Sequence, residues 1–282
     1  MVRIFPLMFV LLWSSAFITT KPIIDNSDPF AALAFRFFFV AIGFYAFSIY
    51  SKNSVFVKRR YLIESTLSGV LFHGFYLGGV FFSISIGMPT GIAALIVTLQ
   101  PILTNALSGP ILGEKVTNKQ WAGVFLGFAG AVMVLGFDVG KDIPALGLLA
   151  TIIALIAITS STIWQKKLSN NLPLSVSNFY QAVGGCFFHI LVVIFFTKPY
   201  IAFTKTFFLA MGHQILLVSF GAFTILMFLI KKNSASKTVS IFFLIPATSA
   251  LMAWFFLGES LTVTDLLGFL ITSIGVYIAT RD

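Results

Sequence analysis

The chain has 282 residues, of which 58% are apolar and only 10% carry a charge, and its mean hydropathy is +1.00. A soluble domain normally carries about 25% charged residues because its surface is solvated, so this composition excludes a soluble globular protein and predicts a lipid-facing surface. A net charge of +9 would suggest nucleic-acid binding in a soluble protein, and the single cysteine, Cys186, excludes an internal disulfide.

Ten apolar stretches follow one another along the chain, each long enough to cross about 30 Å of hydrocarbon as a helix. The predicted spans are 3–20, 30–50, 62–84, 90–112, 119–136, 144–165, 174–197, 207–230, 237–257 and 262–280. Short polar junctions separate several of them, so we expect consecutive helices to be antiparallel neighbours. The pattern predicts an all-α integral membrane protein of about ten transmembrane helices and excludes a β-barrel, whose segments alternate over about ten residues. Arg3 and the first apolar run also fit a cleaved signal peptide, but no convincing cleavage site follows.

The basic residues support ten spans. With both termini inside the cell, the inner loops and termini hold thirteen Lys and Arg residues, the outer loops hold four, and Arg36 lies within a span. Positively charged loops resist translocation, so this bias predicts cytoplasmic termini in the cytoplasmic (inner) membrane. The basic character therefore reflects membrane topology rather than nucleic-acid binding.

The two halves of the chain share a spaced pattern. Pro101 is followed thirteen residues later by Glu114 and then by two glycines, and Pro246 is followed at the same offsets by Glu259 and two glycines. Two five-helix repeats, 1–137 and 138–282, are therefore expected. Because five is odd, the second copy would enter the membrane from the opposite side, an arrangement typical of transporters that open a central site alternately to each side.

These residues also carry a family resemblance. The segment Leu12-Trp13-Ser14-Ser15-Ala16-Phe17, the Pro29…Arg36-Phe37 segment and the repeated Pro…Gly-Glu…Gly…Gly pattern resemble the EamA family of the drug/metabolite transporter superfamily. The resemblance covers nearly the whole chain. It implies a ten-helix inverted-repeat fold and transport of metabolites such as amino acids, without naming the substrate.

Polar residues inside spans are the candidates for contact with a solute, because they are costly in lipid. Arg36 fits two interpretations: its guanidinium binds a substrate carboxylate or phosphate, or it caps a neighbouring helix or reaches the outer interface. His73 and Tyr76 lie one turn apart among glycines in the third span. His73 is expected either to line the cavity, where it could exchange a proton, or to make a buried structural hydrogen bond.

Gln100 and Asn105 flank Pro101 in the fourth span. Proline removes a helical hydrogen-bond donor, so Pro101 and its counterpart Pro246 predict kinks that serve either as hinges around a midplane cavity or as static bends.

Further candidates are weaker. Trp13, Trp164, Tyr180 and Gln181 would line the cavity or, for the aromatic residues, anchor span ends at the interface. His189, His213 and Gln214 lack a counterpart in the other half. Small-residue faces at Gly123/Gly127 and Gly275/Ala279 are expected to pack helices, either against each other or across a dimer. Glu114 and Glu259 are expected to cap the helices that follow them.

The chemistry missing from the spans narrows the function. No carboxylate lies deep in a span, which disfavours the proton-for-cation exchange of the small multidrug-resistance relatives, and no phosphate-binding loop for direct ATP use occurs. The span histidines form no catalytic or metal-binding group, so neither a metal nor a cofactor is expected. We expect a secondary transporter, monomeric or weakly dimeric, that exports amino acids or similar neutral, zwitterionic or anionic metabolites. A drug efflux carrier is the alternative, followed by a membrane enzyme acting on lipids or peptides.

Overall fold

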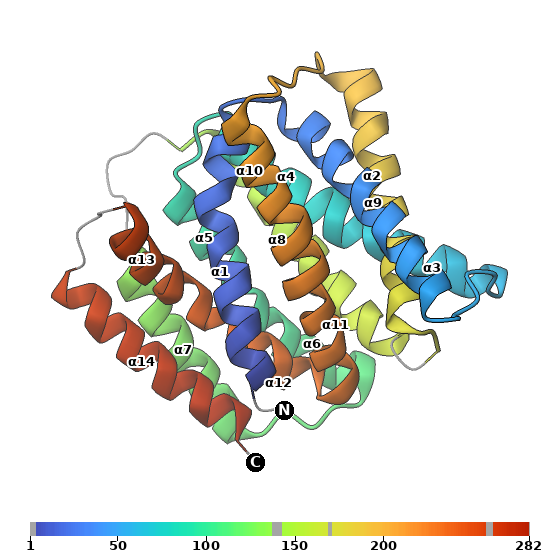
Figure 1. Ribbon diagram of the computed structural model, residues 1–282. Helices are drawn as coiled ribbons and strands as arrows, with labels where there is room; N and C mark the ends of the chain where they lie inside the picture. The colour runs from blue at the N-terminus through green and yellow to red at the C-terminus, as the bar shows by residue number, and fades with distance from the viewer. Residues whose placement is uncertain (1–3, 137–142, 169–170, 258–261, 282) are drawn as a thin grey trace.

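The computed structural model describes residues 4–136, 143–168, 171–257 and 262–281, and its regular elements there are helices. Figure 1 shows them as a bundle. In chain order they are α1 (Phe5–Ile24), α2 (Pro29–Tyr50), α3 (Arg59–Gly69), η2 (Val70–Leu77), α4 (Gly78–Ser85), α5 (Thr90–Val97), α6 (Gln100–Leu112), α7 (Asn118–Leu135), α8 (Ala145–Leu168), α9 (Leu174–Phe196), α10 (Lys205–His213), η3 (Gln214–Ala222), α11 (Phe223–Lys232), α12 (Ala235–Ser240), η4 (Ile241–Phe243), α13 (Leu244–Leu257) and α14 (Val263–Thr280). The predicted all-α membrane fold is confirmed.

Nine helical runs within the described residues are long and apolar enough to cross a bilayer. The tenth expected span is α7, which has 18 residues but opens on the polar sequence Asn118-Lys119-Gln120. These polar residues lower the mean hydropathy of the 18-residue helix, which is why α7 is not among the nine runs. It nevertheless packs along α14, one of the nine runs, so the expected order of ten helices is present.

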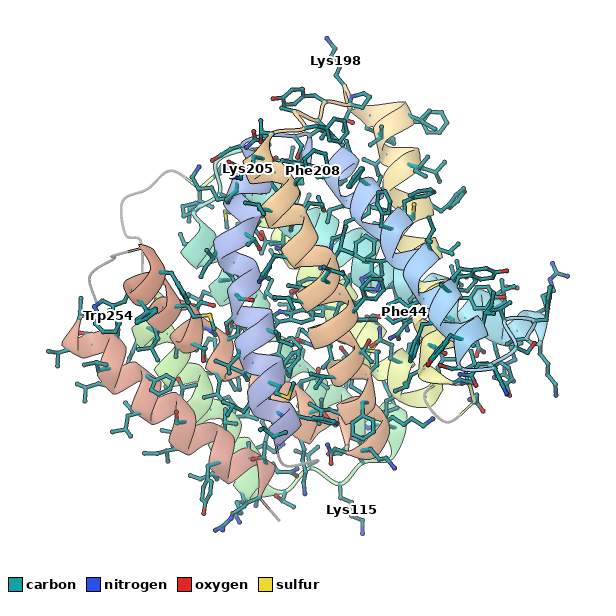
Figure 2. All side chains as sticks on the ribbon, in the orientation of Figure 1. Phe44, Lys115, Lys198, Lys205, Phe208 and Trp254 are labelled. Atoms are coloured by element: carbon teal, nitrogen blue, oxygen red, sulfur yellow. The ribbon has the colours of Figure 1, made fainter. Side chains whose placement is uncertain are left out.

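The surface of the bundle is apolar between its two ends. Large side chains such as Phe38, Phe187 and Phe255 are more than half exposed, which suits contact with lipid. Figure 2 shows Lys115 at one end of the molecule and Lys198 and Lys205 at the other. We call these the Lys115 end and the Lys198 end; α1 begins and α14 ends at the Lys115 end (Figure 1).

Four of the expected spans depart from a continuous α-helix at matching places. The third contains the π-helical segment η2, and the eighth contains the π-helical segment η3. The fourth is interrupted between α5 and α6, with Pro101 in the first turn of α6, and the ninth passes through the 3₁₀ turn η4 just before Pro246. Pro101 and Pro246 are 145 positions apart. The same shift moves the residue numbers of η2 from 70–77 to 215–222, which lie within η3, so the two π-helical segments occupy equivalent positions in the two halves. Departures from α-helical geometry thus lie close to both prolines, and their action as kinks or hinges stays a prediction.

Helices α7 and α14 make the most extensive contact between any two described elements. Glycines allow this approach: a Cβ added at Gly123 would lie 2.4 Å from the backbone nitrogen of Ala279, and one added at Gly275 would lie 2.3 Å from that of Gly127. The small-residue faces therefore pack against each other within the chain, as one of the two expected arrangements requires.

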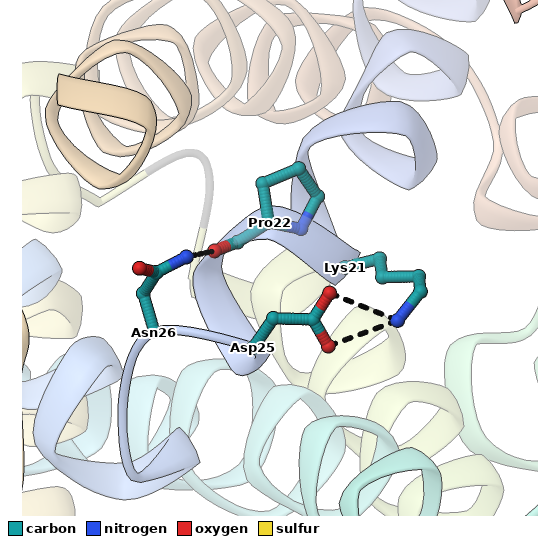
Figure 3. A network of polar contacts seen from close by, with 4 residues as sticks. All are labelled: Lys21, Pro22, Asp25 and Asn26. Atoms are coloured by element: carbon teal, nitrogen blue, oxygen red, sulfur yellow. Dashed lines mark hydrogen bonds and ion pairs between the residues drawn. The ribbon is translucent and has the colours of Figure 1, made fainter. Parts of the chain in front are cut away.

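Two loops that are far apart in the sequence are hydrogen-bonded to each other at the Lys198 end. Asp25 at the end of α1 forms a bidentate ion pair with Lys21, and Asn26 donates from its side chain to the carbonyl of Pro22 (Figure 3). This ordered turn then pairs with the segment before α10, because Asp28 N–H donates to the carbonyl of Tyr200 and Ala202 N–H donates to that of Asn26. The α1–α2 turn is thus held against the α9–α10 connection.

Candidate functional site

Arg36 lies two turns into α2, a helix that begins with Pro29 and is capped by the Asp28 side chain. Its side chain is only 4% exposed, and its Nε donates to Ser219 Oγ in η3 at 2.9 Å. Among the described residues no carboxylate forms an ion pair with it. A buried guanidinium is costly without a negative partner, and among the described residues its one hydrogen bond, to Ser219, uses one of its five N–H groups, so this position can receive an anion.

His73 lies beside Arg36, on the π-helical segment η2. Its ring packs between Phe37, at a centroid distance of 4.4 Å, and Phe223, at 4.6 Å, and its Nδ1 is buried without a partner. Its backbone carbonyl accepts a hydrogen bond from His189 Nε2 at 2.9 Å. The side chain of His73 therefore has one free polar atom within an aromatic wall, and His189 holds the backbone of η2.

Aromatic side chains complete this wall. Phe72 makes edge contacts with Trp13, at 6.1 Å, and with Tyr76, at 5.4 Å. Trp13 and Tyr76 are both buried, and Phe72 also contacts the His73 ring at a centroid distance of 5.2 Å. The structure thus brings together four of the predicted residues: Trp13, Arg36, His73 and Tyr76. We call them, with Ser219, the Arg36 cluster.

Gln100 and Gln181 lie in two further hydrogen-bonded groups of buried polar side chains. Gln100 Nε2 donates to Thr162 Oγ1 on α8, and Gln181 Oε1 accepts from Gln165 Nε2 at 2.7 Å. The hydrogen bonds continue through Gln165 to other side chains on α3, α8 and α9. We call the set the α8 polar cluster; its members are Ser68, Ser161, Gln165, Ser177 and Gln181.

Asn105 and Glu114 bind the ninth span at the Lys115 end. Asn105 Oδ1 accepts from Ser236 Oγ, and the two carboxylate oxygens of Glu114 accept from the backbone N–H groups of Ala235 and Ser236. The expectation that Glu114 caps the following helix was wrong. Thr117 and Gln120 form the cap of α7, so the Glu114 carboxylate caps α12 of the second half instead. Glu259 lies outside the described residues.

Trp164 and Tyr180 lie apart from both clusters. Trp164 lines a surface groove of about 270 Å³ between α6 and α8, and the Tyr180 hydroxyl donates to the carbonyl of Val55, which holds the segment after α2. A second groove, of about 360 Å³, lies between α2 and α9 and is lined by apolar residues and Tyr45. In this conformation neither groove includes the Arg36 cluster.

The sequence missed Ser219, Gln165 and the role of His189. Serine at a span position carries no distinctive signal, because its hydroxyl can bond to its own helix. The sequence also gave no sign that η2 and η3 are π-helical, although both segments contribute residues to the Arg36 cluster and π-helical turns often occur at functional sites.

The model of the EamA-like transporter family matches residues 3–136 and again residues 145–281. The chain belongs to this family. It is therefore a multi-pass membrane transporter of the drug/metabolite transporter superfamily, and not an enzyme, which confirms the resemblance described above. A transporter of this family binds a small-molecule substrate and lies in a lipid bilayer.

The relatives agree with this membership. The chain is 27% identical to the uncharacterized transporter YvbV of Bacillus subtilis, over 75% of this chain and 68% of that protein. It is 23% identical to a probable amino-acid metabolite efflux pump of Escherichia coli, over 96% of this chain and 92% of that one. A solved crystal structure superposes with a TM-score of 0.82 at 18% identity, covering 99% of this chain and 97% of that chain, which supports the fold.

Proposed function

We propose that this EamA-family transporter exports small metabolites that carry a carboxylate, amino acids among them, across the cytoplasmic membrane. One observation carries the proposal: Arg36 is a buried cation whose only hydrogen bond within the described part of the chain is to the neutral hydroxyl of Ser219. A carboxylate matches the paired donors of a guanidinium, and binding it would offset the cost of burying the charge. The name of the Escherichia coli relative supports amino acids as cargo.

The proposed mechanism is alternating access between two inverted repeats, 1–137 and 138–282, with both termini in the cytoplasm. The shared offset between the halves and the breaks before Pro101 and Pro246 support it. Hydrogen bonds at the two ends of the bundle also support it. Opening the Lys115 end would separate Glu114 from α12, and opening the Lys198 end would separate the α1–α2 turn from the segment before α10. Repeats that exchange conformations would expose the Arg36 cluster to each side in turn.

Reconstituted transport tests the proposal. Proteoliposomes containing the full chain are loaded with each of the twenty amino acids, and counterflow of the same labelled amino acid is measured. We expect a subset to give counterflow. Arg36→Ala should lower it at least tenfold, because one charge-assisted, bidentate contact is worth about 1.5–3 kcal/mol.

Arg36→Lys keeps the positive charge but lacks the planar fork, so it should retain part of the activity. A matched control is Arg60→Ala, which removes an arginine whose side chain is 79% exposed and paired with Glu64. Normal counterflow by correctly inserted Arg36→Ala protein would exclude Arg36 from the substrate site. The absence of counterflow for every amino acid would exclude this class of cargo.

A further inference from the structure

The apolar groove between α2 and α9, which we call the α2–α9 groove, opens on the outer surface of the bundle and has a volume of about 360 Å³. Two of its lining residues, Ala41 and Cys186, are small and buried, whereas Phe38 and Phe187 also line it and are more than half exposed. Because the chain spans a membrane, lipid tails rather than water surround such a surface. The groove is therefore a position where an acyl chain can lie between two helices.

The groove lies within the depth of one leaflet. Along α2 its lining residues extend from Phe38 to Tyr45, and the helix ends at Tyr50. At 1.5 Å per residue, Phe38 lies about 18 Å and Tyr45 about 8 Å from the end of the helix. Half of a hydrocarbon core is about 15 Å thick, so the groove faces the acyl chains of the leaflet next to the α2–α3 loop.

The α2–α3 loop, residues 51–58, is held against the same end of the groove. Tyr45 and Phe179 both line the groove and contact each other at a ring-centroid distance of 5.5 Å. The neighbour of Phe179, Tyr180, donates its hydroxyl to the carbonyl of Val55 in the loop at 2.6 Å. One aromatic contact and one hydrogen bond thus connect the groove to the middle of the loop.

The loop and the first turn of α3 carry positive charge that no acidic residue balances. Lys52, Lys58 and Arg59 are exposed and form no ion pair within the described part of the chain, whereas the next residue, Arg60, pairs with Glu64. The sequences of α2, α9 and the loop contain no Asp or Glu. Three positive charges therefore lie beside the groove without a partner of opposite charge.

Aromatic residues place this loop at the membrane surface. Phe56 lies between the basic residues of the loop and is 93% exposed, and Tyr50 at the end of α2 is also largely exposed. Exposed aromatic side chains at the end of a span are typical of the interface between hydrocarbon and water. The basic residues accordingly lie at the level of the lipid headgroups.

We propose that an anionic phospholipid binds to this transporter, with its phosphate at Lys52, Lys58 and Arg59 and one acyl chain in the α2–α9 groove. The groove alone would not select this lipid, because phospholipid tails are alike in polarity. Selection comes from the basic residues, since Lys and Arg clustered beside the cytoplasmic end of a span attract anionic headgroups. The expected topology places the α2–α3 loop on that side, where the membrane surface is negative.

Lipid binding to the purified full-length chain tests the proposal. The protein in detergent is mixed with equal concentrations of dioleoylphosphatidylglycerol and dioleoylphosphatidylcholine, and the first lipid bound is identified by native mass spectrometry. The two lipids have the same acyl chains, so their ratio measures the effect of the headgroup. We expect phosphatidylglycerol to be favoured about 100-fold, because each of three basic residues near a headgroup contributes about fivefold.

A triple variant removes the charge beside the groove. Lys52→Gln, Lys58→Gln and Arg59→Gln together should bring the ratio close to one. All three positions are exposed, so the fold should be unaffected, and an unchanged melting temperature checks this.

The control variant removes the same charge elsewhere. Lys115→Gln, Lys198→Gln and Lys205→Gln change three exposed lysines outside the α2–α3 loop, which Figure 2 labels, and together they should leave the preference for phosphatidylglycerol intact.

A soluble phosphate ester tests the contribution of the acyl chain. Glycerol 3-phosphate presents a phosphate without a tail, so at the same concentration as the lipid it should not displace phosphatidylglycerol. Displacement would show that the basic residues bind phosphate without the groove, and it would overturn the site as proposed.

The other outcomes are equally decisive. Equal binding of both lipids by the unaltered protein, an unchanged ratio in the first triple variant, or an equal loss in the lysine control would overturn the lipid site. A stable dimer that carries no lipid under these conditions would assign the groove to a second copy of the chain instead. The assay measures no transport, so its result is separate from that of the counterflow experiment.

Discussion

At the scale of single residues, burial and hydrogen-bond partners distinguish the candidate substrate-binding residues from one another, which the sequence could not do. Arg36 and His73 are both buried beside the same phenylalanine, Phe37; Arg36 donates one hydrogen bond to the neutral hydroxyl of Ser219, and His73 Nδ1 has no partner. Tyr180, by contrast, uses its hydroxyl to hold a loop. Buried polar groups are normally hydrogen-bonded, which is why we propose a substrate as the partner of the first two.

His73 gives a prediction at this scale. His73→Phe should preserve the packing against Phe37 and Phe223 while removing Nδ1, so the thermal stability of the purified protein should change little and counterflow should fall about tenfold. His73→Ala removes the packing as well and should lower both. Full counterflow in His73→Phe would show that the ring serves packing alone.

At the scale of elements, glycines decide how closely helices approach. The α7–α14 contact depends on glycines that oppose backbone atoms of the other helix, so even a methyl group has no room. Similar contacts join α3 to α9, where a Cβ at Gly184 would lie 2.2 Å from the carbonyl oxygen of Thr66. These contacts position η2, and therefore His73, against α9.

Gly123→Ala is expected to lower the stability of the protein. The added Cβ would lie 2.4 Å from Ala279 N, so α7 and α14 would have to separate, at a cost of about 1–3 kcal/mol. Gly212→Ala is the matched control, because nothing lies within 4 Å of its added Cβ, and helix propensity alone should leave stability equal or slightly higher. Melting temperatures in detergent measure both, and equal values would contradict the close α7–α14 contact.

At the scale of the whole molecule, the distribution of charged residues predicts the membrane topology. Figure 2 places Lys115 and Lys198 at opposite ends of the bundle. The excess of basic residues in alternate loops predicts that the Lys115 end faces the cytoplasm. This assignment also sets the direction in which the second repeat enters the membrane.

Single cysteines would test this topology. In a Cys186→Ser background, Lys198→Cys should react with a membrane-impermeant maleimide in intact cells, and Lys115→Cys should react only after permeabilisation. Replacing Cys186 removes the one native thiol, and a serine there can donate to the carbonyl of Ala34 as the thiol does. Labelling of both positions from the same side would contradict the alternate arrangement of loops and remove the basis for inverted repeats.

The sequence by itself determined the membrane class, the order of the helices, the 145-residue offset between the halves and the presence of polar groups such as Arg36 and His73 inside spans. These are properties of local composition and spacing, because a helix in lipid bonds its own backbone and needs a fixed apolar length. Only the tertiary structure decided that Arg36 meets Ser219, 183 residues away, that Glu114 caps α12, and that Trp164 and Tyr180 lie elsewhere. Such contacts depend on the rotation and crossing of packed helices, which glycine contacts and π-helical turns set and which hydropathy along a single span does not record.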